Sequence, residues 1–286
     1  MGTIRTLASL VKFEHTVFAL PFAYAGMALG ADAAGVDLSV SLVVWITIAM
    51  VGARTLAMGL NRVIDREIDA RNPRTAVREI PSGKVSPAQV WLLCAVSLAL
   101  LVLATFQLDP ITRVLWPIPV ALFLLYPYTK RFTWLCHAVL GLSIGLAPLG
   151  AWLAVGGPGS ELAPYLLWIG IACWIGGFDV IYATADVDFD RANQIQSLPA
   201  RFGVARALVV VKLAHAVTIG CFALAAWQLE LGLAAWIGIG IGAALLVWEN
   251  SIVSADDLSR IDHAFFTVNS WVGVALGGGL VLAALA

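Results

Sequence analysis

The chain has 286 residues, of which 60% are hydrophobic and only 12% are charged, and its formal net charge is −1. With a mean hydropathy of +0.90, this composition excludes a soluble enzyme and indicates an integral membrane protein. The small charged fraction gives no reason to expect a nucleic-acid partner.

Nine apolar segments, each roughly long enough to cross a bilayer, follow one another along the chain. They cover residues 16–30, 39–64, 88–106, 111–128, 134–155, 164–185, 204–228, 231–250 and 263–286. We therefore predict an all-α fold, a polytopic bundle of nine transmembrane helices around a central cavity, built as a single domain over residues 1–286. The first segment is expected to remain as an anchor and not to be cleaved as a signal peptide.

The basic residues predict how these segments are oriented. Of the 17 Lys and Arg residues, Arg54 lies inside the second segment and Arg113 lies on the opposite side. The other 15 lie near the segment ends that the positive-inside rule assigns to the cytoplasm. We therefore predict a protein of a prokaryotic cytoplasmic (inner) membrane, surrounded by lipid. Its N terminus should lie inside, its C terminus outside, and its active site should face the cytoplasm.

A first polar cluster stands where the second apolar segment ends. Asn61, Asp65 and Asp69 recur every four residues, so on a helix they share one face over two turns. Carboxylates spaced in this way suit a hard divalent cation that itself carries phosphate oxygens. The alternative is an ordinary charged face beside the membrane.

A second cluster, Asp179, Asp186 and Asp190, lies near the end of the sixth segment at spacings of seven and four, and these residues also share a face. If the two helices pack with these faces together, the carboxylates converge on one pocket and repel one another unless cations neutralise them. Mg²⁺ ions would do so and would leave coordination positions for a diphosphate.

Basic side chains near the two clusters are candidates for holding that diphosphate. Arg54 and Asp179 lie inside apolar segments, where a charge needs a partner or a wet cavity, so both are predicted to belong to the diphosphate-binding site, with Asn61. Lys130 and Arg131 follow the fourth segment directly. Further candidates in the polar loops are Arg66, Arg71, Arg74, Arg78, Lys84 and Arg201.

Aromatic faces near the mouth of the pocket would stabilise positive charge. The candidates are Tyr126, Tyr128, Phe178 and Tyr182. Lys12 and His15 precede the first segment, where they either meet an acidic substrate or belong to an amphipathic helix on anionic lipid. His137 and His215 are interpreted as hydrogen-bonding residues between packed helices.

Several motifs together resemble one family. They are Asn61-Arg-Val-Ile-Asp65-Arg-Glu-Ile-Asp69, Ala-Arg71-Asn-Pro-Arg74-Thr75, Pro81-Ser-Gly83, Tyr126-Pro-Tyr-Thr-Lys130-Arg131 and Asp186-Val-Asp-Phe-Asp190. This pattern resembles the UbiA superfamily of intramembrane aromatic prenyltransferases, and the resemblance extends over essentially the whole chain. It implies transfer of a polyprenyl group from a polyprenyl diphosphate to a small aromatic acid in respiratory quinone biosynthesis, with Mg²⁺ as cofactor.

The resemblance also implies roles for single residues. It implies that Mg²⁺ and the diphosphate are bound by Asn61, Asp65, Asp69, Asp186 and Asp190. The four Asp residues of this set are the predicted catalytic residues. Lys12, Arg62 and Tyr182 are candidates for contacting the acceptor. Many 4-hydroxybenzoate enzymes have Asn-Asp at the head of the first motif, whereas Arg62 follows Asn61 here. The Asn61-Arg62 start, together with Asn72-Pro73-Arg74-Thr75, slightly favours a dihydroxynaphthoate of the futalosine menaquinone route, and 4-hydroxybenzoate, for ubiquinone, stays open as the other acceptor.

Two other readings of the sequence stay open. A UbiA-type enzyme with another acceptor, or a terpene cyclase, would use the same carboxylates. A cation-coupled membrane transporter would also place Asp residues inside apolar segments, but it needs access from both sides. The charged residues here gather at one side, which favours an enzyme over a transporter.

Overall fold

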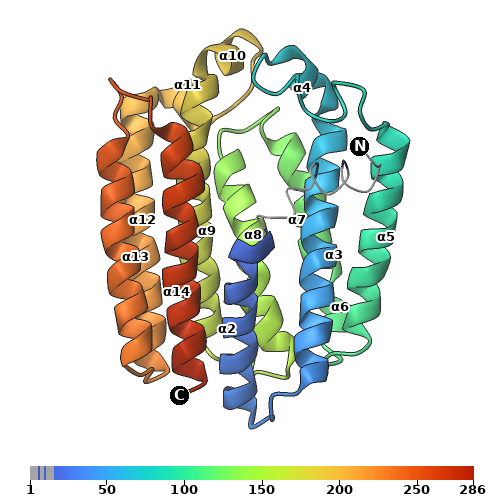
Figure 1. Ribbon diagram of the computed structural model, residues 1–286, viewed down its shortest axis with the longest axis vertical. Coiled ribbons are helices and arrows are strands. Elements are labelled where there is room, and N and C mark those ends of the chain that lie inside the picture. Colours follow the sequence, from blue (N-terminus) through green and yellow to red (C-terminus); the bar gives the residue numbers. More distant parts are fainter. Residues whose placement is uncertain (1–5, 7–9, 11–15) are drawn as a thin grey trace.

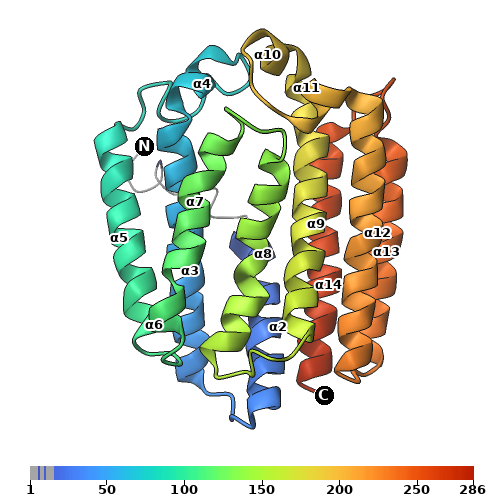
Figure 2. The same cartoon turned by 180° about the vertical axis from the view of Figure 1, so that it is seen from behind.

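The computed structural model of this chain describes residues 6, 10 and 16–286, with the backbone alone for 16–19 and Phe265. The described residues form an all-helical bundle whose long helices run side by side (Figures 1 and 2). The elements are α2 (Thr16–Ala34), α3 (Val40–Ile64), α4 (Arg66–Arg71), α5 (Pro87–Thr105), α6 (Thr112–Leu115), α7 (Pro117–Thr129), α8 (Cys136–Ala154), α9 (Ala163–Ala183), η2 (Thr184–Asp186), α10 (Val187–Ala192), α11 (Leu198–Phe202), α12 (Val204–Gln228), α13 (Leu233–Ile252), η3 (His263–Val268) and α14 (Asn269–Ala284). Lys12 and His15 lie outside the described residues.

Helices occupy all nine of the predicted segments, and seven of them are long and apolar enough to cross a membrane. Those seven include α3, α5, α8, α12 and α13, a segment that runs from α9 into α10, and one that ends with α14. The fourth predicted segment is not one helix, because it is divided into α6 and α7 at Pro117. A proline lacks the amide hydrogen that would continue the α6 hydrogen-bond ladder.

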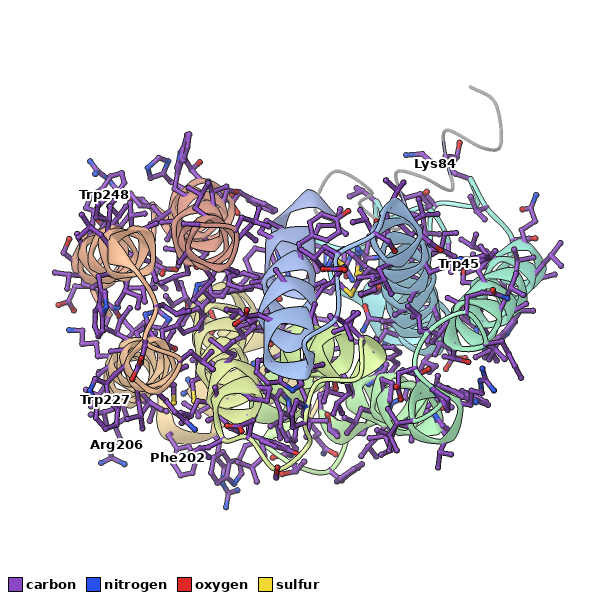
Figure 3. All side chains as sticks on the ribbon, turned by 90° about the horizontal axis from the view of Figure 1, so that it is seen from below. Trp45, Lys84, Phe202, Arg206, Trp227 and Trp248 are labelled. Carbon is purple, nitrogen blue, oxygen red and sulfur yellow. The ribbon has the colours of Figure 1, made fainter. Side chains whose placement is uncertain are left out.

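The long helices pack into two connected groups. α2, α8, α9, α12, α13 and α14 pack in a ring, each against the next, around an apolar core that includes Trp152, Ile171, Phe222 and Leu276. α3 packs against α5 and α7, and α7 packs against α8, which joins the groups. Side chains such as Trp227 and Trp248 lie on the outside of the bundle, as the view along it shows (Figure 3). An exposed apolar surface of this kind suits contact with lipid.

The short polar helices gather at one end of the bundle. α4, α10 and α11 lie at the upper end in Figure 1, whereas the C terminus lies at the opposite end. α3 stops at Ile64 and α4 begins at Arg66, so the first Asp cluster is not on one continuous helix as predicted. Asp69 N–H nevertheless donates to the Asp65 carbonyl at 2.8 Å, which keeps the four-residue spacing across the break.

Local sequence signals explain where several helices begin. Ser86 Oγ accepts a hydrogen bond from Gln89 N–H, and Gln89 Oε1 accepts one from Ser86 N–H, which is a capping box. Pro87 stands in the first turn of α5. Ser39 caps α3 and Ser197 caps α11 in a similar way, through backbone N–H groups of the first turn.

Close contact between α8 and α9 depends on glycine. A Cβ atom on Gly141 would lie 2.1 Å from the carbonyl oxygen of Ala172, and one on Gly145 would lie 2.8 Å from that of Trp168. Small residues let helix backbones approach one another in this way inside a membrane. Because the obstructing atoms belong to the backbone, the helices themselves would have to separate.

We expect Gly141→Ala to lower the free energy of unfolding by roughly 1–3 kcal/mol, the usual cost of overpacking a core. Gly240→Ala is the matched control, since a Cβ atom there meets nothing within 4 Å. Thermal unfolding of both variants in detergent measures the difference. Equal stability of the two variants would contradict this account of the α8–α9 contact.

Candidate active site

A single cavity of about 940 Å³ connects the polar end of the bundle with its apolar interior. Residues of α3, α7, α8 and α9 form most of its wall, and α8 lines it from Cys136 to Ala154. At 1.5 Å per residue, this is a length of about 27 Å. Charged and polar groups line the upper part, whereas Leu108, Leu115 and Leu153 line the lower part. The cavity is therefore long, with one polar end and one apolar end.

Asp65 lies at the break between α3 and α4 and is 1% exposed. Its Oδ2 accepts hydrogen bonds from Asn61 Nδ2 at 2.8 Å and from Lys130 Nζ at 2.6 Å. Burial raises the pKa of the Asp65 carboxyl, and the Lys130 ammonium opposes this rise. Its Oδ1 is buried and has no hydrogen-bond partner among the described residues, and Arg131 Nη2 lies 3.9 Å from it.

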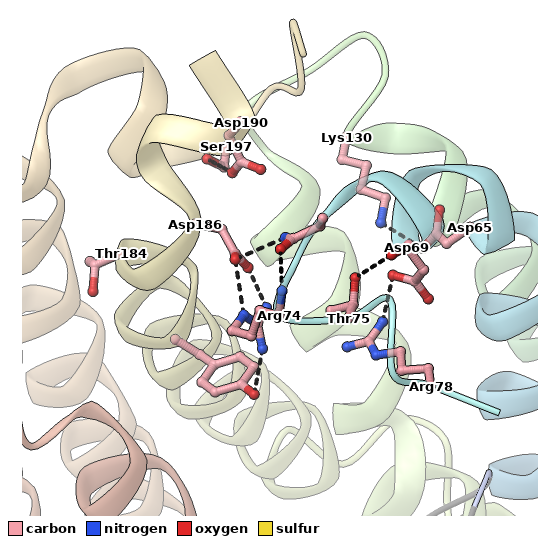
Figure 4. Close-up of polar contacts among 12 residues, drawn as sticks. Asp65, Asp69, Arg74, Thr75, Arg78, Lys130, Thr184, Asp186, Asp190 and Ser197 are labelled. Atoms are coloured by element: carbon pink, nitrogen blue, oxygen red, sulfur yellow. Dashed lines mark hydrogen bonds and ion pairs between the residues drawn. The ribbon is translucent and has the colours of Figure 1, made fainter. Parts of the chain in front are cut away.

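Asp69, which is 4% exposed, lies one turn further on, in α4. Its Oδ1 accepts a hydrogen bond from Arg78 Nη1 at 2.7 Å, and its backbone carbonyl accepts one from Thr75 Oγ1 at 3.0 Å (Figure 4). Its Oδ2 is buried and, within the described part of the chain, has no hydrogen-bond partner. Asp65 and Asp69 thus each keep one buried oxygen to which no residue of the described part of the chain donates.

Asp186 ends the 3-10 turn η2 that follows α9. Arg74 holds it through two hydrogen bonds, from Nε to Oδ1 at 2.9 Å and from Nη2 to Oδ2, and Asn72 Nδ2 donates to Oδ1 at 3.0 Å (Figure 4). Arg74 Nη1 also donates to the Tyr182 hydroxyl at 2.6 Å. The loop after the first motif thereby binds the second motif directly.

Asp190 and Asp179 have other partners. Asp190 Oδ2 accepts a hydrogen bond from Ser197 Oγ at 2.6 Å, which ties α10 to the start of α11. Asp179 Oδ2 lies 2.6 Å from His137 Nδ1 of α8. The interpretation of His137 as a residue that hydrogen-bonds between helices is therefore correct, and its partner is one of the candidate carboxylates.

Most of the predicted site residues line this one cavity. They are Arg54, Asn61, Arg62, Asp65, Asp69, Lys130, Asp179, Tyr182, Asp186 and Asp190, together with Arg74, Arg78, Tyr126 and Phe178. Arg131 and Tyr128 are not in the cavity wall; Arg131 instead donates to the Ile64 carbonyl at 2.8 Å and lies over the Tyr128 ring. Lys12 lies outside the described residues. Arg54 and Arg62 each have a buried Nε without a hydrogen-bond partner within the described chain.

The carboxylates do not meet in one cluster. Among the described residues, no group of three or more His, Cys, Asp or Glu side chains is arranged to hold a metal ion. Lys130, Arg78 and Arg74 each pair with a different carboxylate instead, because buried like charges need a counter-charge. The unpartnered oxygens of Asp65 and Asp69 fit a divalent cation, since hard cations prefer carboxylate oxygens.

Sequence reasoning did not identify Asn72, Thr75 and Ser197 as part of the site. The Asn72-Pro73 pair predicts a turn. In the structure, Asn72 Oδ1 accepts a hydrogen bond from Arg74 N–H in an Asx turn. Ser197 was likewise recognisable as a helix cap ahead of Pro199. Neither signal reveals that the same side chains contact Asp186 and Asp190.

Comparison with known proteins identifies the family. The UbiA prenyltransferase family model matches residues 19–271. A 4-hydroxybenzoate octaprenyltransferase of Pseudomonas fluorescens is 30% identical over 244 residues, which are 85% of this chain and 81% of that one. The apo structure of a UbiA homolog from Aeropyrum pernix K1 has a TM-score of 0.85 and 31% identity, covering 94% of this chain and 98% of that one. A UbiA homolog from Archaeoglobus fulgidus bound to DMAPP and Mg²⁺ has a TM-score of 0.63 at 16% identity, covering 95% and 99%.

This chain therefore belongs to the UbiA prenyltransferase family. The resemblance noted in the sequence is confirmed, and so is the prediction that the chain is an enzyme of the aromatic prenyltransferase class. The all-α membrane fold is confirmed to the extent of seven candidate spans.

The Lys130–Asp65 pair yields a prediction about stability. Lys130→Met should lower the free energy of unfolding by about 1–3 kcal/mol, because it leaves a buried carboxylate without its donor. The double variant Lys130→Met/Asp65→Asn should recover part of that loss, since the uncompensated charge is gone. Chemical denaturation of the four proteins of this cycle, without metal, measures the coupling. Additive losses would show that the pair contributes no coupling energy.

Proposed function

We propose that this enzyme transfers a polyprenyl group from a polyprenyl diphosphate to a small aromatic acid, in the biosynthesis of a respiratory quinone and with Mg²⁺ as cofactor. One observation carries the proposal: buried, unpartnered carboxylate oxygens and basic side chains stand at the mouth of a cavity that continues as an apolar channel along all of α8. Such a cavity suits a substrate with a charged head and a long hydrocarbon tail.

The polar end is proposed to hold the diphosphate. Asn61, Asp65, Asp69, Asp186 and Asp190 would bind Mg²⁺ between them, with Asp65 Oδ1 and Asp69 Oδ2 as the oxygens already available. When bound, Mg²⁺ supplies positive charge that stabilises the departing diphosphate. The cavity wall also contains Lys130, Arg74 and Arg78, which form hydrogen bonds with these carboxylates. These three cations are therefore placed to bind phosphate oxygens as well.

The rest of the cavity is proposed to control the reaction that follows. As the bond between C1 of the prenyl chain and the diphosphate oxygen breaks, positive charge develops on the allyl group, and the electron-rich ring attacks C1. Tyr126, Phe178 and Tyr182 line the cavity and present aromatic rings to this charge. The apolar channel excludes water, which would otherwise convert the cation to an alcohol.

For the acceptor, the position of Arg54 favours a role different from the diphosphate binding first predicted. It precedes Asp65 by eleven residues, which is about 16 Å along α3. A guanidinium at that depth in an apolar wall suits the carboxylate of an aromatic acid. The relatives named for 4-hydroxybenzoate favour that acid; Arg62 beside Asn61 keeps a dihydroxynaphthoate as the second candidate.

In the membrane, we propose nine crossings around the cavity, with α2 and the α6–α7 pair added to the seven candidate spans. The basic loops after α3 and α7, and the one between α9 and α12, would then face the cytoplasm of a prokaryotic inner membrane. The active site would open toward the soluble acid on that side, and the channel would take the prenyl chain from the lipid phase.

The central test is transfer by the purified protein in detergent, with Mg²⁺, a labelled polyprenyl diphosphate and both candidate acids. Asp65→Asn and Asp186→Asn should each lower turnover at least about 100-fold, as expected when a charge that stabilises the leaving group is removed. Thermal unfolding of each variant shows whether it is folded. Wild-type turnover in both variants, or full activity in excess chelator, would refute the proposed site.

The same assay tests the acceptor assignment. Arg54→Met should raise KM for the aromatic acids while leaving KM for the prenyl diphosphate unchanged. A charged hydrogen bond of about 1.5–3 kcal/mol corresponds to a change of roughly 10- to 150-fold. An increase confined to the diphosphate KM would return Arg54 to the diphosphate.

The orientation is tested with a reporter fused after Ala286. We expect activity from a reporter that works outside the cytoplasm, because nine crossings put the two termini on opposite sides. Activity from a cytoplasmic reporter would contradict the nine-span arrangement, whatever the enzyme assay shows.

A further inference from the structure

One face of α9 lines the cavity from its polar end to its interior. The lining residues on this helix and its extension include Ile171, Trp174, Phe178, Asp179, Tyr182 and Asp186. Asp179 is seven residues before Asp186, which is roughly 10 Å deeper along the helix axis. It therefore lies below the level of the diphosphate site and beside aromatic side chains.

His137 fixes the position of the Asp179 side chain. His137 Nδ1 lies 2.6 Å from Asp179 Oδ2, and His137 Nε2 lies 3.3 Å from the backbone N–H of Leu198. Since Leu198 N–H is a donor, Nε2 acts as acceptor, and the proton of a neutral ring is assigned to Nδ1, which donates to Asp179. The geometry thus matches a carboxylate oriented by a neutral imidazole.

The other oxygen of Asp179 is available to a substrate. The side chain is 23% exposed and lines the cavity, and within the described chain Oδ1 has no hydrogen-bond partner. The basic residues that pair with carboxylates at the polar end are bound to Asp65, Asp69 and Asp186. Among the described residues, Asp179 therefore has no Lys or Arg partner, and it lies in the cavity wall below the level of Asp186.

We infer that Asp179 accepts the ring proton in the last chemical step, and that His137 is the residue that positions it. This inference rests on the proposed function. Attack of the ring on C1 forms a carbon–carbon bond and releases diphosphate, leaving a ring cation with a hydrogen on the substituted carbon. Asp179 Oδ1 takes that proton, the electrons of the C–H bond restore the aromatic ring, and the resulting carboxylic acid later returns its proton to water.

This role makes a different prediction from diphosphate binding, the role first predicted for Asp179. A diphosphate ligand acts before and during ionisation, so its loss should raise KM for the prenyl diphosphate. A proton acceptor acts after the ring has attacked, so its loss should leave that KM unchanged and make the breaking of the ring C–H bond limit the rate.

The experiment compares ordinary 4-hydroxybenzoate with the acid deuterated at the ring carbons next to the hydroxyl group, using the full-length protein in detergent with Mg²⁺. For Asp179→Asn we expect kcat to fall about 100-fold or more, within the usual range for a lost acid–base group. We also expect a primary deuterium isotope effect on kcat that is larger than in the wild type, and an unchanged KM for the prenyl diphosphate. Asp188→Asn is the matched control, because Asp188 is exposed and outside the cavity wall.

His137 gives the positioning test. His137→Leu should lower kcat and raise the isotope effect, whereas His137→Asn, whose amide can still donate to Asp179, should restore most of kcat. If Asp179→Asn keeps the wild-type kcat and isotope effect, or raises only the diphosphate KM, the inference is overturned while the proposed function stands. A wild-type protein that prenylates no aromatic acid overturns the proposed function and this inference with it.

Discussion

The structure depends on the burial of carboxylates at the end of an apolar helix bundle. Asp65 and Asp69 are almost fully buried, and charge in such a place is costly unless it is paired. Lys130, directly after α7, and Arg78, from the loop after α4, supply the counter-charges, so these carboxylates hold separate elements together. Arg74 does the same across the cavity, since it joins the loop that follows the first motif to Asp186 of the second. The need to neutralise buried charge therefore determines which elements pack together at the polar end.

The two Asp motifs have the same backbone arrangement, in which a long helix ends and a short helix follows. α3 ends just before Asp65, and the six-residue helix α4 follows; α9 ends before the turn that contains Asp186, and the six-residue helix α10 follows. In each motif the second Asp, Asp69 or Asp190, lies in the short helix after the break and is buried.

Much of this was predictable from the sequence, for physical reasons that can be stated. The apolar segments and the four-residue spacing of Asn61, Asp65 and Asp69 depend on local periodicity, so helices, a polar end and candidate carboxylates could be read directly. The breaks at Asp65 and Asp186 could not, because no proline or glycine marks either position. Contacts such as Asn72 with Asp186, 114 residues apart, depend on tertiary packing and leave no local pattern. The eleven-residue spacing of Arg54 and Asp65 could be read from the sequence, but that both side chains line one cavity could not, because it depends on how α3 packs.

The wall of the cavity also depends on residues far from the motifs. Asn269 Nδ2 donates to Glu249 Oε1 at 2.7 Å and to the Ala264 carbonyl at 3.0 Å, so its amide oxygen faces Trp174, whose Nε1 donates to it at 2.6 Å. The π-helical turn η3, which brings Ala264 and Asn269 together, stands directly before α14. Trp174 in turn packs edge-on against Phe178 and at a tilt against Phe22, and all three rings line the cavity. The buried Glu249 on α13 and the Ala264 carbonyl thus fix the orientation of the Asn269 amide, and the amide oxygen in turn holds the Trp174 ring through its Nε1. The shape available to a substrate is therefore determined as much by this buried polar network as by the carboxylates at the mouth.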